Sequence, residues 1–110
     1  MLVTGASSGI GEATALAFAR RGARLALCAR RLDRLQAVAE RCRQAGASAV
    51  TTRRTDVGRR AEARAFVMGA LRDFDAIDVL VNNAGSGWVG RFHEVPDDEV
   101  TRLVETNLLG

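Results

Sequence analysis

The chain has 110 residues, of which 47% are hydrophobic, enough for one small globular core but too few for two domains. The formal net charge is +3, and all sixteen basic residues are arginines spread over several predicted helices, so no cluster or stripe of cations predicts a nucleic-acid-binding face. No apolar run is long enough to span a membrane and no signal peptide is visible, so we expect a cytoplasmic protein with neither membrane nor nucleic-acid partners.

An apolar run, Met1–Val3, leads into the glycine-rich segment Thr4–Gly11 and then into a helical pattern. A strand whose end becomes the first turn of a helix offers free backbone N–H groups and the positive end of the helix dipole, which together bind phosphate. We expect Gly5 to make the turn off the strand, Gly9 to let the backbone approach a pyrophosphate, and Gly11 to let the helix pack closely.

Ser7 and Ser8 add hydroxyl donors to the same loop. The glycine spacing is G-x-x-x-G-x-G, and the segment lacks the G-K-[ST] of a triphosphate-binding P-loop. A glycine-rich turn without a ligand is the alternative interpretation of this segment taken alone.

Helical and strand patterns alternate along the rest of the chain. The predicted elements after the first strand are helix 9–21, strand 25–29, helix 32–45, strand 47–54, helix 59–73, strand 77–81 and a helix starting near residue 96. This order predicts an α/β fold, a doubly wound Rossmann-type parallel sheet of about four strands with helices on both faces. In such sheets ligands bind at the carboxyl ends of the strands.

Arg30 and Arg31 follow the predicted strand 25–29, about twenty residues beyond the glycine motif. In a dinucleotide site this position meets the adenosine ribose, where a carboxylate favours NAD(H) and an arginine suits the 2′-phosphate of NADP(H). The sequence therefore favours NADP(H) over NAD(H). Solvated arginines at the start of a helix are the alternative, although cations are unfavourable at that end of the helix dipole.

Two polar residues later in the chain allow more than one role. Asp56 follows the predicted strand 47–54, where it can accept a hydrogen bond from an adenine amino group or cap the next helix. Asn107 lies on an apolar stripe of the last helix, so we expect it to be buried and to bind a backbone carbonyl, an ordered water or an active-site water network.

The two cysteines and the single histidine do not indicate a reactive site. Cys28 and Cys42 have no close C-x-x-C spacing, which indicates packed thiols in a reducing compartment and not a disulfide or a metal site. His93 has no recognisable nucleophile partner, so we interpret it as a surface residue.

Taken together, four motifs resemble the short-chain dehydrogenase/reductase family over essentially the whole chain: Thr4-Gly5-x-x-x-Gly9-Ile10-Gly11, Asp56-Val57, Asn82-Asn83-Ala84-Gly85 and Asn107-Leu108-Leu109-Gly110. The resemblance implies an NADP(H)-dependent oxidoreductase that acts on a small carbonyl or alcohol substrate, and a homo-oligomer in its full-length form. The cofactor-binding residues that it implies are Gly5, Ser7, Ser8, Gly9, Ile10, Gly11, Arg30, Arg31, Asp56, Val57, Asn83, Ala84 and Gly85.

The resemblance also assigns roles to individual residues. The glycine loop would hold the pyrophosphate, Asp56 and the Val57 backbone would meet adenine, and Asn83 to Gly85 would line the ribose and nicotinamide side. Asn82 would tie the central strands together. Asn107 would be the asparagine of the catalytic tetrad, which holds a water in the proton relay.

The resemblance implies that the family's catalytic serine and Tyr-x-x-x-Lys motif lie beyond this stretch, and a chain with no tyrosine and no lysine cannot supply that motif. We therefore expect residues 1–110 to be the NAD(P)-binding, amino-terminal half of a single-domain enzyme, slightly trimmed at its start, and inactive alone. A non-catalytic dinucleotide-binding module is the alternative. A methyltransferase-like domain is disfavoured, because it would want a carboxylate where Arg30 stands.

Overall fold

The computed structural model describes residues 1–86 and 91–109, so residues 87–90 of the predicted glycine-rich loop and Gly110 of the last motif lie outside the described residues. Its four strands form one parallel sheet in the order β3-β2-β1-β4. The elements in chain order are β1 (Leu2–Thr4), α1 (Gly9–Ala19), β2 (Arg24–Ala29), α2 (Leu32–Ala45), β3 (Ala49–Arg54), α3 (Arg60–Phe74), β4 (Leu80–Val81), the 3-10 turn η1 (Phe92–Glu94), α4 (Asp97–Val104) and the π-helical turn η2 (Glu105–Leu109). The predicted α/β fold with a doubly wound parallel sheet is confirmed.

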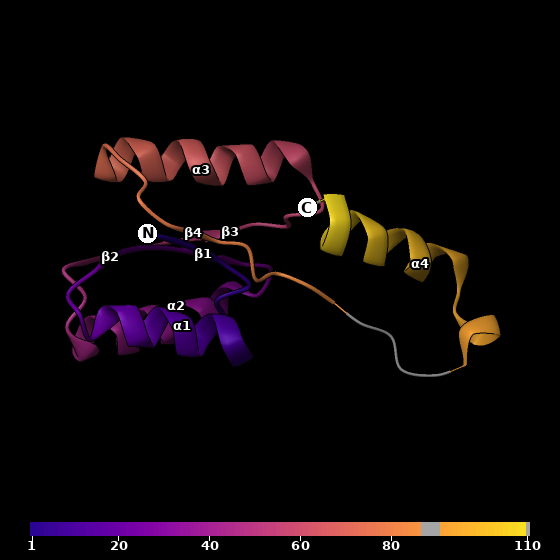
Figure 1. Cartoon of the computed structure of the whole chain (residues 1–110), viewed down its shortest axis with the longest axis horizontal. Coiled ribbons are helices and arrows are strands. Elements are labelled where there is room, and N and C mark those ends of the chain that lie inside the picture. The colour runs from indigo at the N-terminus through magenta and orange to yellow at the C-terminus, as the bar shows by residue number, and fades with distance from the viewer. Residues whose placement is uncertain (87–90, 110) are drawn as a thin grey trace.

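Helices cover both faces of the sheet, with α1 and α2 on one side and α3 on the other (Figure 1). The alternation of β2 explains this arrangement: Leu25 and Leu27 pack in the cluster with α1 and α2, whereas Ala26 and Cys28 pack against Phe66 and its neighbours on α3. A strand covered on both faces needs apolar residues at every position, which is why β2 reads as a continuous apolar run.

Helix ends follow the glycine signals in the sequence. Gly22 has φ +76° after α1, and Gly46 has φ +119° after α2, a backbone conformation that favours glycine. The helix α1 ends at Ala19, two residues before the predicted Arg21, because the chain already turns toward Gly22 there.

The run at residues 77–81 looks like the strongest strand in the sequence, yet only Leu80 and Val81 pair as β4. Their partners on β1 are Leu2 and Val3, so β4 is limited by the short neighbour it pairs with. The predicted five-residue strand is therefore wrong in length.

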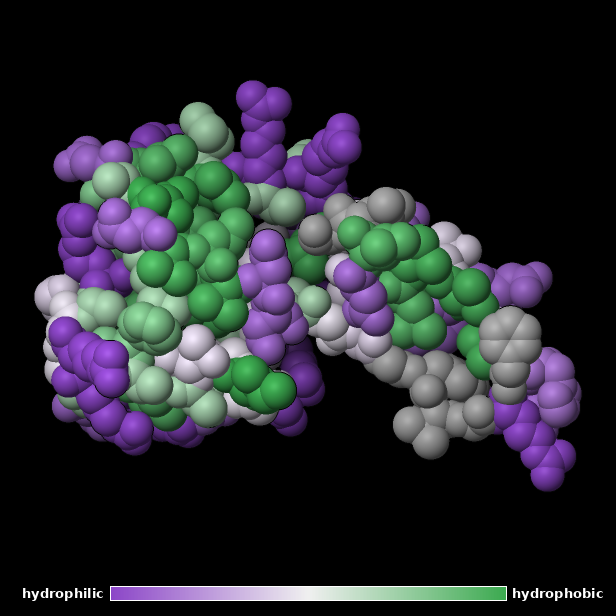
Figure 2. Space-filling view, viewed as in Figure 1, coloured by the Kyte–Doolittle hydropathy of each residue, from purple (hydrophilic) through white to green (hydrophobic). Residues whose placement is uncertain are grey.

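The apolar stripe of α4 is not buried, contrary to the sequence expectation. Val100, Val104 and Leu108 are 41%, 43% and 77% exposed, and none of the residues of α4 is buried. The helix lies beside the sheet and not across it, with neither face packed against a layer (Figure 1). Figure 2 shows hydrophobic side chains at the surface in the region of this helix, separated by hydrophilic side chains from those of the main body.

Within the described part of the chain, none of the helices combines the length and the apolar character that a membrane crossing requires.

Candidate cofactor site

The loop between β1 and α1 is built by glycines for the reasons that the motif suggests. Gly5 and Gly9 have φ of +64° and +57°, and a Cβ on Gly5 would lie 2.8 Å from the Ala84 Cα atom. Gly11 is buried, and a Cβ there would lie 2.3 Å from the carbonyl oxygen of Gly5. A Cβ on Gly9, in contrast, would meet nothing within 4 Å, so glycine is favoured there by its positive φ and not by a close contact.

The start of α1 has the properties of an anion site. Ser8 precedes the helix in an extended conformation, and its side chain makes no capping hydrogen bond, which leaves the first-turn N–H groups without a side-chain acceptor. Glu12, the acidic residue of that turn, is engaged by Arg41 of α2. Ile10, an apolar side chain in this loop, is 77% exposed.

Thr4 and Asn83 join the glycine loop to the end of β4. The Thr4 hydroxyl accepts hydrogen bonds from the backbone N–H groups of Asn83 and Ala84, each at 3.0 Å. The Asn83 amide nitrogen donates to the carbonyl oxygens of Thr4 and Gly5 at 3.2 and 3.3 Å. The tie between the central strands thus comes from Asn83, whereas Asn82, which the sequence interpretation placed in that role, is exposed.

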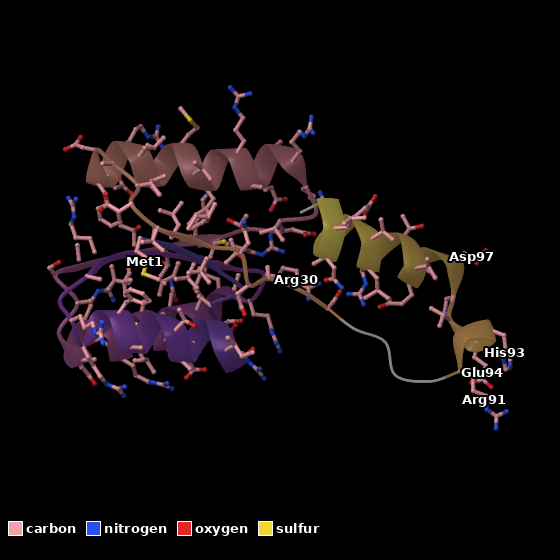
Figure 3. The ribbon with its side chains drawn as sticks, viewed as in Figure 1. Met1, Arg30, Arg91, His93, Glu94 and Asp97 are labelled. Atoms are coloured by element: carbon pink, nitrogen blue, oxygen red, sulfur yellow. The ribbon has the colours of Figure 1, made fainter. Side chains whose placement is uncertain are left out.

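Arg30 and Arg31 follow β2 at the carboxyl edge of the sheet, and both are exposed. Figure 3 shows Arg30 at the end of the main body that faces α4. No carboxylate of the described residues lies within ion-pair distance of either guanidinium group. Two unneutralised cations at the start of α2 oppose the dipole of that helix, so a bound anion would relieve an unfavourable arrangement.

The N-cap residue of α3 is Arg59, with no side-chain capping hydrogen bond, so the helix-capping role considered for Asp56 is not found; Asp56 instead closes a turn before the helix. Its Oδ1 accepts the Gly58 N–H at 3.0 Å in a turn before α3, and Arg59 lies 3.8 Å from Oδ2. Glu62 completes the turn by accepting the Asp56 backbone N–H at 2.7 Å. Because Oδ2 makes only this long contact, the turn and a hydrogen bond to a ligand are compatible.

These segments surround one cleft of about 270 Å³, close to the lower end of the range for small-molecule sites, roughly 300–1,000 Å³. It is lined by Gly5, Ser7, Ser8, Ile10, Ala29, Arg30, Arg31, Thr55, Asp56, Val57, Asn83, Ala84, Gly85 and Thr106. Gly9, Gly11 and Asn107, which the sequence singles out, are not among the lining residues. Ala29, Thr55 and Thr106 line the cleft without having been singled out, although each directly precedes a residue that was.

Asn107 lies near the cleft but is turned to the backbone of the β4 loop. Its Oδ1 accepts the Ser86 N–H at 2.7 Å, and its Nδ2 donates to the Ser86 carbonyl oxygen at 2.6 Å. The amide is exposed and not buried, because the helix that carries it is uncovered. Of the partners considered from the sequence, the backbone carbonyl is the one found.

The two cysteines are free and buried. Burial raises the pKa of the Cys28 thiol to about 12, with hydrogen bonds from Thr55 and the Gly5 backbone acting in the opposite direction. Burial also raises the pKa of Cys42. Neither thiol is therefore activated as a nucleophile. His93 is exposed at the surface, 3.8 Å from Glu94 (Figure 3). Among the described residues no group of three histidine, cysteine or carboxylate side chains could hold a metal ion.

Comparison with known proteins identifies relatives over the whole chain. The family model described as short chain dehydrogenase matches residues 1–110. An 11-beta-hydroxysteroid dehydrogenase-like protein 4A of Arabidopsis thaliana is 44% identical over the whole chain, which covers 37% of that protein. An uncharacterized oxidoreductase of Staphylococcus saprophyticus is 39% identical, and the chain covers 44% of its length.

Two solved structures are similar over almost all of the chain. An alcohol dehydrogenase from the archaeon Thermococcus sibiricus, complexed with 5-hydroxy-NADP, is 41% identical with a TM-score of 0.92 over 98% of this chain and 46% of that one. A metagenomic short-chain oxidoreductase in complex with NADP is 38% identical with a TM-score of 0.90, over 98% and 49%. The chain thus spans less than half the length of these relatives. It belongs to the short-chain dehydrogenase/reductase family.

Proposed function

We propose that this chain forms the cofactor-binding half of an NADP(H)-dependent oxidoreductase that interconverts a carbonyl and an alcohol in a small-molecule substrate. The observation that carries the proposal is the cleft that joins the uncapped start of α1 to the two arginines after β2. A dinucleotide needs an anion site for its pyrophosphate and a second contact for its ribose, and these two features supply both.

The pyrophosphate would lie on the glycine loop. The first-turn N–H groups of α1 have no side-chain acceptor, and the backbone beside them takes a φ of +57° at Gly9, a conformation that favours glycine. Ser7 and Ser8 line the same cleft with hydroxyl groups. Bound there, the anion would also benefit from the positive end of the helix dipole.

The adenosine end would lie between the loops after β2 and β3. Arg30 and Arg31 carry the charge and the donor geometry that suit a 2′-phosphate. Asp56 and Val57 line the same cleft, and the Oδ2 of Asp56, whose contact with Arg59 is 3.8 Å long, could accept a hydrogen bond from an amino group. NADP(H) is therefore favoured over NAD(H).

The nicotinamide end would lie toward Asn83, Ala84 and Gly85, where the hydride is exchanged when the cofactor is bound. The double hydrogen bond from Asn107 to Ser86 fixes this loop against η2. Asn107 would thereby hold the loop in place, and its role in a proton relay stays a prediction. The general acid would come from the remainder of the enzyme, since these 110 residues include no tyrosine.

Exchanging Arg30 for aspartate tests the cofactor assignment in the protein expressed from the complete reading frame. A charge-assisted contact contributes about 1.5–3 kcal/mol, so Arg30→Asp should reduce the preference for NADPH over NADH about tenfold or more. Arg20→Asp, the same charge change on an exposed residue outside the cleft, is the matched control. Equal affinities for the two cofactors before and after the change would overturn the assignment.

A further inference from the structure

We infer that Arg54 is a third cation of the site, positioning Arg30 and Arg31 for the 2′-phosphate and thereby setting the preference for NADP(H). The inference rests on the proposed function, which needs only the two arginines after β2. Arg54 ends β3, twenty-three residues or more from those arginines in sequence, and is brought beside them by the sheet. Its Nε donates a hydrogen bond of 3.2 Å to the carbonyl oxygen of Arg30.

That bond acts on the peptide from which both arginines project. The parallel pairing of β2 and β3 places Arg54 opposite Ala29, and the Thr55 N–H donates to the Ala29 carbonyl oxygen at 2.9 Å. Consecutive carbonyl groups of the β2 end are therefore held from β3. The directions in which Arg30 and Arg31 leave the backbone depend on this anchoring.

The charge of Arg54 adds to the same region without a nearby carboxylate to cancel it. Among the described residues none of the three guanidinium groups is within ion-pair distance of a carboxylate, including Asp33 in the first turn of α2. Arg31 precedes α2 in an extended conformation with no side-chain cap, so the positive end of that helix dipole faces the same place. Three cations and the start of a helix together favour an anion of high charge density. A 2′-phosphate monoester is such an anion, whereas a ribose 2′-hydroxyl is uncharged.

Arg53 provides a matched control because neighbouring residues of a strand point to opposite faces. It pairs with Cys28, on the α3 face of the sheet, and its Nη1 lies 3.8 Å from the point where a Cβ on Gly69 of α3 would be. Arg53→Gln and Arg54→Gln thus remove the same charge from adjacent positions, one away from the cleft and one beside it.

The test compares binding of 2′,5′-ADP and 5′-AMP by calorimetry in the complete protein, since the two ligands differ only in the 2′-phosphate. Arg54→Gln should weaken 2′,5′-ADP binding about tenfold and change 5′-AMP binding less than about twofold. Arg53→Gln should change neither by more than about twofold. Unchanged 5′-AMP binding also shows that the variant is folded.

Each of three results would overturn the inference. Equal weakening of both ligands by Arg54→Gln would indicate a structural role only, and equal effects of the two variants on 2′,5′-ADP would indicate the general field of the protein. If the wild-type protein prefers 2′,5′-ADP and Arg54→Gln has no effect, Arg54 has no part in binding the 2′-phosphate, and the proposed function still stands. A wild-type protein with no preference for 2′,5′-ADP would instead contradict the proposed cofactor, and the inference with it.

Discussion

Replacing Gly11 with alanine tests whether the close contact between α1 and the glycine loop supports the site. The new Cβ would lie 2.3 Å from the Gly5 carbonyl oxygen and 2.5 Å from the Asn83 Nδ2, whereas real Cβ atoms essentially never come within 3.0 Å of another atom. The first of these neighbours is backbone, so the helix and the loop have to move apart.

Two terms set the expected size of the effect. Overpacking a tight site costs about 1–3 kcal/mol, and each hydrogen bond of Asn83 that is lost adds about 1 kcal/mol. Alanine is a better helix former than glycine, which offsets at most about 1 kcal/mol of this loss in the free energy of unfolding. We expect Gly11→Ala to lower the free energy of unfolding by about 2–4 kcal/mol in total.

Gly69→Ala is the matched control, because it makes the same change inside α3. A Cβ there would touch only the guanidinium ends of Arg53 and Arg72, each 3.8 Å away, which is ordinary contact. This variant should gain about 0.5–1 kcal/mol of stability from helix propensity. Urea unfolding of both variants at one protein concentration measures the two effects.

A second consequence separates this argument from a general loss of stability. Because the loop shifts, Gly11→Ala should also weaken NADPH binding in conditions where the variant is still folded. A Gly11→Ala protein as stable as wild type, or one that is destabilised no more than Gly69→Ala, would refute the packing argument.

Three further predictions concern other parts of the chain. Asn83→Ala removes the donor to the Thr4 and Gly5 carbonyl oxygens and should destabilise the protein by about 1–3 kcal/mol in urea unfolding, whereas Asn82→Ala at the exposed neighbour should change stability by less than about 0.5 kcal/mol. Since burial raises the pKa of Cys28 from 9.0 to about 12, its contribution to stability is complete below pH 9 and falls by up to about 1.4 kcal/mol per pH unit between pH 9 and 12. Cys28→Ala should therefore make the loss of stability above pH 9 less steep and leave the part that the buried Cys42 contributes. Expressed alone, residues 1–110 should bind a hydrophobic dye, self-associate in sedimentation and show no NADPH oxidation with carbonyl substrates; a compact, non-dye-binding monomer or measurable turnover would contradict this.

Much of the fold follows from local patterns in the sequence. The continuous apolar run at residues 25–29 predicts a strand buried on both faces, and the glycines at 22 and 46 predict the ends of α1 and α2. The cleft is also predictable, because parallel strands place their carboxyl ends at one edge, where eleven of the fourteen lining residues had been expected.

The remaining features depend on contacts between distant segments. A strand of two residues, such as β4, is too short for the alternation of its side chains to show whether Asn82 or Asn83 points toward β1. The pairing of β4 with β1 decides that Asn83 reaches Thr4. The apolar stripe of α4 predicts burial, but periodicity identifies a face without supplying the surface that covers it. The bond from Arg54 to Arg30 joins two strands, and only the sheet brings them together.

The relative affinity of the complete protein for NADPH and NADH tests the central claim most directly. The Arg30–Arg31 pair and the uncapped start of α2 should make NADPH bind at least about tenfold more tightly, as followed by fluorescence of the bound nicotinamide. The difference should shrink as salt is raised, because the 2′-phosphate contact is a charge interaction at an exposed site. Tighter binding of NADH, or equal binding of both cofactors at low salt, would contradict the account.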